Sequence, residues 1–121
     1  LDSALLDRSV KTIVITSQAS QDSFTKPETG KNKLILETID FNKEIASQIT
    51  EVLFQNELQS VIIEGGGKTL QTFIDSGLWD EARIFTGETM FSEGVKAPEF
   101  KGKLARKHNL GSDKLKIYTN D

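Results

Sequence analysis

The chain has 121 residues, 36% of them hydrophobic and 27% charged, which is typical of one globular domain. Its net charge of −3 gives no electrostatic basis for binding nucleic acid, and no apolar run reaches the roughly 20 residues that span a bilayer. The absence of cysteine excludes disulfides and thiolate metal sites, and His108 is the single histidine, so we predict no metal site.

The N-terminus points to the cellular context that we expect. The chain begins at Leu1 and shows no basic-then-apolar signal region. We therefore expect a cytoplasmic protein, and we interpret the 121 residues as a piece of a longer chain.

The first half combines two apolar runs with one amphipathic pattern. Thr12–Thr16 is β-branched and predicts a strand that is buried on both faces. Residues 17–32 are polar and predict a loop in which any helical turn is short, and residues 34–36 predict a second strand. A helix should follow, with Asn42 as its N-cap and its end near Asn56. Its apolar stripe is Ile45, Ile49, Val52 and Leu53.

The pattern of strand and helix then repeats. Residues 61–63 are Val-Ile-Ile and predict another buried strand. Leu70, Phe73 and Ile74 indicate a second amphipathic helix, which Gly77 should close in the C′ position. Strands that alternate with helices are typical of parallel βαβ units.

The last third changes character. Glu81–Thr86 predicts a strand, and residues 104–110 and 114–119 predict two more around a turn that includes Gly111. We therefore predict an α/β fold, with a parallel sheet core flanked by helices and a C-terminal antiparallel hairpin. No linker divides the chain, so we assign residues 1–121 to a single domain.

A glycine-rich turn is the main functional candidate. Glu64-Gly65-Gly66-Gly67-Lys68 connects the strand predicted at 61–63 to the second helix. Glycine permits positive φ and close approach of another molecule, and the helix start offers unpaired N–H groups and a positive dipole end. These features favour a phosphate or pyrophosphate site. A tight strand-to-helix connection without a ligand is the alternative.

Two known phosphate-binding motifs resemble the sequence of this turn, but neither matches it in full. Gly67-Lys68-Thr69 ends like a Walker A loop, but Ile62 stands where that motif needs its first glycine. A dinucleotide fingerprint that starts at Gly65 would need glycine where Leu70 stands. The turn therefore belongs to neither class.

Glu64 lies at the end of the predicted strand, directly before the glycines. A carboxylate at this position could accept hydrogen bonds from a ribose or from a substrate N–H. The alternative is an ordinary solvated acid, and the residues themselves favour neither interpretation.

A family resemblance narrows these alternatives. Residues 61–81, VIIEGGGKTLQTFIDSGLWDE, resemble the signature of the reductase domain of bacterial bifunctional riboflavin biosynthesis proteins. Residues 91–98, FSEGVKAP, resemble the loop that follows in that family, although Ser92 replaces its usual glycine. The likeness covers nearly the whole chain and is strongest over residues 60–98.

The resemblance implies a fold, an activity and a site. The fold would be dihydrofolate-reductase-like, and the chain would be the C-terminal portion of the reductase domain. The activity would be the NADPH-dependent reduction of the ribosyl side chain of 5-amino-6-(5-phosphoribosylamino)uracil. Glu64 would bind this pyrimidine substrate. The NADP phosphate site would be lined by Gly66, Gly67, Lys68, Thr69, Leu70, Gln71 and Thr72.

The resemblance leaves some questions open. The family's N-terminal half of the domain and its zinc deaminase motif are not in this sequence, so we expect these residues alone to be inactive. No residue can be assigned as catalytic proton donor. A homodimer is expected if an apolar surface is left uncovered. The alternatives are a non-catalytic nucleotide-binding or assembly module, or another dihydrofolate-reductase-like reductase.

Overall fold

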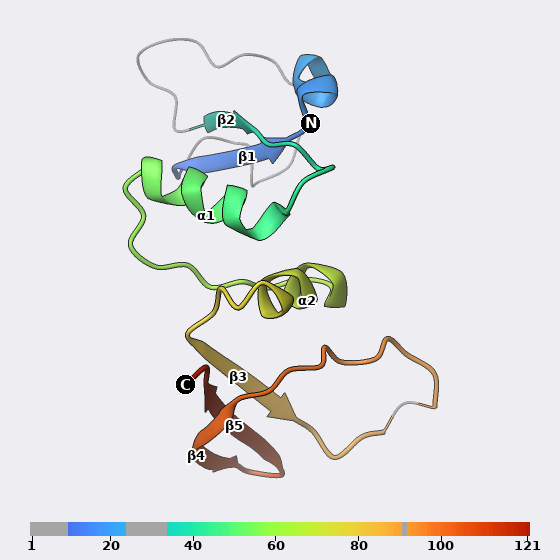
Figure 1. Ribbon diagram of the computed structural model, residues 1–121. Coiled ribbons are helices and arrows are strands. Elements are labelled where there is room, and N and C mark those ends of the chain that lie inside the picture. The colour runs from blue at the N-terminus through green and yellow to red at the C-terminus, as the bar shows by residue number, and fades with distance from the viewer. Residues whose placement is uncertain (1–9, 24–33, 91) are drawn as a thin grey trace. The chain divides into compact units, whose positions relative to one another are not determined.

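A computed structural model describes residues 10–23, 34–90 and 92–121 (Figure 1). The chain divides into two compact units, Leu1–Ser60 and Val61–Asp121. Each unit is built around its own small sheet, and the assignment of both to a single domain stays a prediction. In the described part of the chain, no helix combines the length and apolar character that a membrane crossing requires.

The first unit is a parallel strand pair accompanied by a helix. Its elements are β1 (Thr12–Thr16), the short 3₁₀ helix η2 (Gln18–Ser23), β2 (Leu34–Thr38) and α1 (Ile45–Gln55). β1 and β2 pair in parallel from Thr12↔Leu34 to Thr16↔Thr38. Both predicted strands are confirmed, and the helical turn in the polar loop is short. The predicted burial of β1 on both faces is wrong, because β1 is half-buried except at Thr16 and has one neighbouring strand, β2, in the described structure. The loop beyond Ser23 lies outside the described residues.

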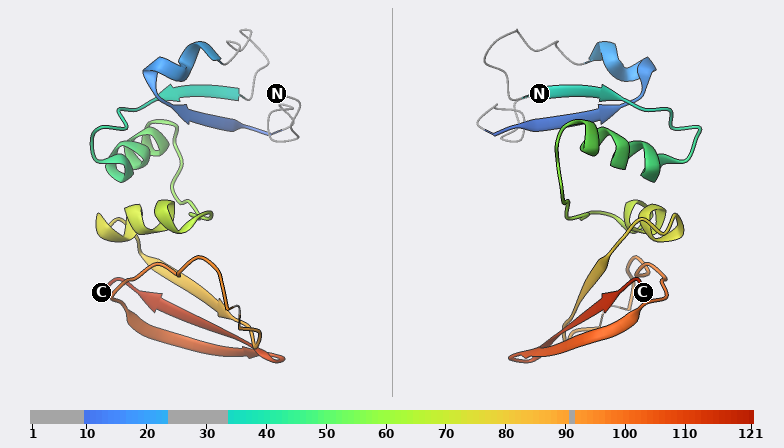
Figure 2. Two further views of the ribbon diagram at one scale, coloured as in Figure 1. Left: turned by 90° about the vertical axis from the view of Figure 1, so that its right-hand side faces the viewer. Right: turned by 60° about the vertical axis from the view of Figure 1, so that its left-hand side comes forward.

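α1 buries one side, and in both views of Figure 2 it lies along the β1–β2 pair. Ala46 and Val52 are buried, and the predicted stripe residues Ile45, Ile49 and Leu53 are half-buried. The C-cap of the helix is Asn56, as predicted. Its Nδ2 donates a hydrogen bond of 3.3 Å to Oε1 of Glu37 in β2, which ties the helix end to the strand pair.

The N-cap of α1 differs from the prediction. Asn42 is not the cap, because the helix begins at Ile45, and the Asn42 N–H donates to Oδ1 of Asp40 in the turn that precedes it. Glu44 takes the role instead, and its carboxylate accepts from the N–H groups of Ala46 at 2.9 Å and Ser47 at 3.0 Å. The longer Glu side chain reaches both donors, and it satisfies two of the unpaired N–H groups at the helix start.

The second unit carries a helix and an antiparallel sheet. Its elements are α2 (Gly67–Asp75), β3 (Glu81–Thr86), β4 (Lys103–Leu110) and β5 (Asp113–Thr119). The strand order is β3-β5-β4, with both pairings antiparallel. A two-residue turn joins β4 to β5, and Gly111 takes a φ of 63° at its first position. The predicted C-terminal hairpin and the α/β class are therefore confirmed.

The buried strand predicted at residues 61–63 is wrong. This segment belongs to no strand of the described structure, and Val61 and Ile62 are 51% and 85% exposed. A β-branched run favours extended backbone, but a strand also needs a neighbouring strand for its hydrogen bonds. Neither β3, β4 nor β5 pairs with this segment, so the run leads into the glycine turn as unpaired backbone.

Candidate functional site

The glycine turn joins this unpaired segment to α2. Gly65 has a φ of 126°, which side chains rarely adopt, so this position requires glycine. Gly66 is the N-cap of α2, with φ −67° and ψ 159°, and it provides no capping side chain. A Cβ built at Gly66 would meet no atom within 4 Å. The helix start is therefore open to the approach of another molecule.

The first turn of α2 leaves backbone donors available. The N–H groups of Thr69 and Leu70 donate to the Gly66 carbonyl at 3.1 and 3.3 Å. Those of Gly67 and Lys68 donate to no residue in the described part of the chain. Two unpaired N–H groups at the positive end of a helix suit an anionic ligand such as a phosphate.

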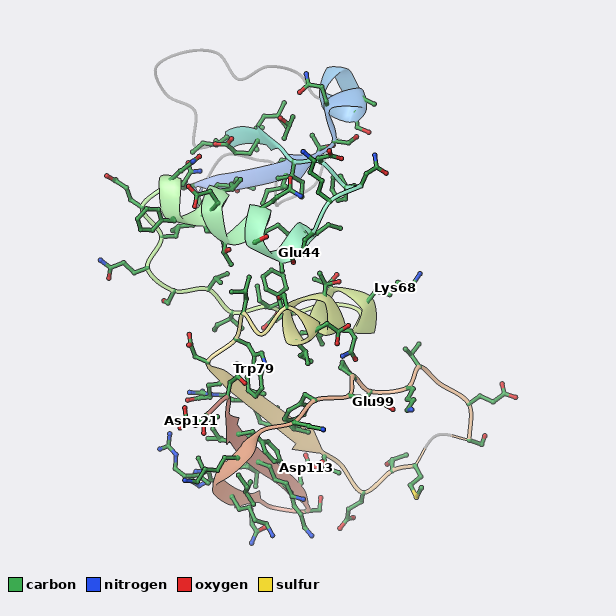
Figure 3. All side chains as sticks on the ribbon, in the orientation of Figure 1. Glu44, Lys68, Trp79, Glu99, Asp113 and Asp121 are labelled. Carbon is green, nitrogen blue, oxygen red and sulfur yellow. The ribbon has the colours of Figure 1, made fainter. Side chains whose placement is uncertain are left out.

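The charged residues of the turn are solvated. Lys68 is exposed, and Figure 3 shows its side chain extending away from the start of α2. The ion pairs found among the described residues do not include Lys68 or Glu64. Glu64 is likewise exposed, directly before Gly65. Both side chains are therefore free to turn toward a ligand.

The remaining residues predicted for the cofactor site are on α2. Thr69 is exposed and Leu70 is half-buried. The Thr72 hydroxyl donates to the Lys68 carbonyl at 2.8 Å, so its hydrogen is already used inside the helix. The structure thus brings the residues from Gly66 to Thr72 together within two helical turns, with their backbone donors concentrated at the N-terminal end.

The Gln71 side chain is engaged elsewhere. Its Nε2 donates to the Glu99 carbonyl at 2.8 Å, and its Oε1 accepts from the Glu99 N–H at 2.9 Å. Nε2 also donates to Oδ1 of Asp75 at 2.8 Å. This amide therefore connects α2 to the loop that precedes β4.

That loop also approaches the glycine turn itself. A Cβ built at Gly67 would lie 3.7 Å from the Lys96 carbonyl oxygen and 3.9 Å from Cγ1 of Val95. Lys96 also forms an ion pair with the Glu99 carboxylate. Residues 95–99 therefore run beside the start of α2, within the motif that the sequence singled out at 91–98. Phe91 of that motif lies outside the described residues.

The C-terminal end of α2 is closed as the sequence predicted. Gly77 has a φ of 71° and its N–H donates to the Ile74 carbonyl, while the Leu78 N–H donates to the Phe73 carbonyl. This pair of bonds is the Schellman motif. Asn120 adds a contact that sequence patterns do not reveal, because its Nδ2 donates to the carbonyls of Gly77 and Trp79 at 3.2 and 2.9 Å.

Aromatic rings fasten the same end of the unit. Trp79 meets Phe100 edge-on at 5.6 Å between ring centroids, and Phe100 meets Tyr118 edge-on at 5.1 Å. Trp79 therefore packs against other aromatic side chains of the same unit. The cluster anchors the loop from residues 92–100 at its far end, while Gln71 holds it near the turn.

Comparison with known proteins identifies the family. The model of the RibD C-terminal domain family matches residues 1–116. A riboflavin biosynthesis protein RibD from Aquifex aeolicus is 29% identical over 111 residues, and the match covers 84% of this chain and 30% of that protein. The chain thus spans about a third of the length of this relative.

Solved structures show the same fold. RibD from Acinetobacter baumannii, in its form 2, superposes with a TM-score of 0.61 at 15% identity over 90% of this chain and 37% of that one. A Shewanella sp. PV-4 protein assigned to riboflavin biosynthesis gives 0.56 at 19% identity, over 96% of this chain and 76% of that one. The dihydrofolate-reductase-like α/β fold is therefore confirmed, and the match over residues 1–116 means that the chain belongs to the RibD C-terminal domain family.

Proposed function

We propose that this chain is part of an NADPH-dependent reductase of riboflavin biosynthesis, acting on the ribosyl side chain of 5-amino-6-(5-phosphoribosylamino)uracil. Membership of the RibD C-terminal domain family supports the pathway and the reaction class. The observation that carries the cofactor assignment is the open start of α2. There, Gly66 has no side chain and the N–H groups of Gly67 and Lys68 are unpaired within the described structure.

Each residue of the turn has a physical role in this proposal. NADPH supplies the hydride, so the protein contributes binding, orientation and electrostatics. The backbone donors of Gly67 and Lys68 would bind a cofactor phosphate, and the Lys68 ammonium would add a positive charge. The other residues that we place around this phosphate site are Gly66, Thr69, Leu70, Gln71 and Thr72. Glu64 would accept hydrogen bonds from the substrate.

The substitution Gly66→Asp tests the phosphate site. Space and backbone angles at Gly66 permit a side chain, and Asp is a better N-cap than glycine by a few tenths of a kcal/mol. The variant should therefore keep or gain stability. Its carboxylate would occupy the anion position and repel a phosphate, so NADPH affinity should fall at least about tenfold, which corresponds to about 1.4 kcal/mol.

Gly66→Asn is the matched control, because Asn has the same shape and capping ability without the charge. NADPH titration should show a much smaller loss for Asn than for Asp, and thermal melting should show both variants folded. An unchanged affinity for Gly66→Asp would show that the turn binds no phosphate. NADPH binding without oxidation when the pyrimidine substrate is added to the full-length protein would favour a non-catalytic nucleotide-binding module instead.

A further inference from the structure

The Gln71 side-chain amide pairs with the backbone of Glu99 through one donor and one acceptor, as neighbouring backbone groups do in a sheet. It donates to the C=O and accepts from the N–H of one residue, Glu99, and its second amide hydrogen goes to Asp75. Both donor hydrogens and one acceptor position of the side chain are therefore occupied. A half-buried side chain with these partners is held in one orientation, along the helix and toward the loop.

The helix face explains why this contact reaches the glycine turn. Gly67 and Gln71 are four residues apart, so they lie on the same side of α2. The loop follows that side, with Lys96 and Val95 beside Gly67 and Glu99 beside Gln71. An exposed ion pair between Lys96 and Glu99 also joins the two points of contact. Fixing Glu99 therefore fixes the backbone that borders the unpaired donors at the start of α2.

We infer that Gln71 is a positioning residue, which holds residues 95–99 as a wall of the cofactor phosphate site and does not bind the phosphate with its own side chain. The inference rests on the proposed function. Without the Gln71–Glu99 pair, the loop would have to be ordered at the moment of binding, and that entropy cost would weaken affinity. The loss should appear in cofactor binding and leave the chemical step unchanged.

The first unit supplies a matched control. Gln48 makes the same pairing with Asp40: its Oε1 accepts from the Asp40 N–H and its Nε2 donates to the Asp40 carbonyl, both at 2.8 Å. Gln48 is also on a helix, and it also braces the loop beside that helix. Replacing either glutamine by Met removes the hydrogen bonds and keeps an unbranched chain of similar length. The two variants differ in the loop that is released.

The experiment compares Gln71→Met with Gln48→Met in the full-length protein, by NADPH titration, steady-state kinetics and thermal melting. Gln71→Met should raise the Kd and KM for NADPH about tenfold and leave kcat within about twofold. Both variants should lower the melting temperature, by similar amounts, because each loses an equivalent set of hydrogen bonds. Gln48→Met should leave the Kd for NADPH unchanged. If Gln71→Met does not fold, Gln71→Ala removes the same hydrogen bonds with the residue of highest helix propensity and should raise the Kd by a similar factor.

Each outcome decides a different question. Unchanged Kd and KM in a folded Gln71 variant would overturn the positioning role and leave the proposed function intact. Equal weakening by both glutamine variants would also overturn it, because the effect would then be one of general stability. Failure of the unaltered protein to bind NADPH would overturn the proposed function and this inference with it.

Discussion

Gly102 and Trp79 approach so closely that no side chain fits between them. A Cβ built at Gly102 would lie 2.9 Å from Cη2 of the indole, 3.1 Å from the Thr119 carbonyl oxygen and 3.3 Å from the ring of Phe100. The requirement is one of space, because two of the three obstacles are rings that are themselves packed edge-on. The third obstacle is backbone at the end of β5. The glycine thus lets the loop before β4 close over the aromatic cluster.

We predict that Gly102→Ala destabilises the protein. The added methyl group must displace Trp79 or Phe100 from the edge-on contact, and overpacking of this kind costs about 1–3 kcal/mol. Urea unfolding followed by the fluorescence of Trp79, the single tryptophan, measures both the loss of stability and the change around the indole.

Gly87→Ala is the control for this prediction. A Cβ at Gly87 would meet only Oδ1 of Asp113, at an ordinary contact distance of 3.5 Å. This variant should leave the free energy of unfolding within about 0.5 kcal/mol of the unaltered protein. Equal stability of the two alanine variants would contradict the prediction, because it would show that the aromatic rings rearrange at little cost to accommodate a methyl group at Gly102.

The features that the sequence predicted are those set by local chemistry. β1 and the β4–β5 hairpin follow from β-branched runs and turn residues, and Gly77 follows from the positive φ that ends α2. The glycine turn belongs to the same class, because Gly65 and Gly66 shape the backbone without help from distant residues.

The features that escaped prediction depend on distant partners. Gln71 and Glu99 are 28 residues apart, and Asn120 is 43 residues from Gly77. No sequence periodicity predicts such pairs, because a polar residue on a helix or at the chain end is expected to be exposed to solvent. The strand wrongly predicted at 61–63 fails for the same reason: hydrophobic pattern records burial preference but does not provide the neighbouring strand.

A second prediction concerns the end of α1. Glu57 has a φ of 64°, the single positive value among described residues other than glycine, and it closes a Schellman motif with N–H bonds from Glu57 to Phe54 and from Leu58 to Leu53. The left-handed conformation costs a residue with a Cβ about 1–2 kcal/mol. Glycine relieves this strain but has greater conformational entropy in the unfolded chain, which offsets part of the gain. Glu57→Gly should therefore raise the free energy of unfolding by a net amount of about 0.5–1 kcal/mol.

Glu57→Ala separates backbone strain from side-chain charge. Alanine removes the carboxylate and keeps the Cβ, so its stability should stay close to that of the unaltered protein. Urea unfolding of the three proteins provides the comparison. A gain for alanine as large as the gain for glycine would assign the effect to charge and contradict the role of the positive φ.

The last prediction concerns pH. The Ser47 hydroxyl, followed by the backbone N–H groups of Ser47 and Ala46, lowers the pKa of the Glu44 carboxyl, because each donor favours the ionised form. The folded-state pKa thus lies below the unfolded value, which is about 4.3 for an ordinary glutamate. The cap therefore contributes its stability above that unfolded value, and the contribution disappears as the pH falls through the lowered folded-state pKa.

Glu44→Gln should remove this part of the pH dependence, since an amide does not titrate. Unfolding free energies at pH 7 and pH 3 should differ less in Glu44→Gln than in the unaltered protein, and the variant should be the less stable of the two at pH 7. Glu51→Gln, on the exposed surface of the same helix, should retain the original difference. An equal pH dependence in the Glu44 and Glu51 variants would contradict the capping role, because the acid sensitivity would then arise from other carboxylates.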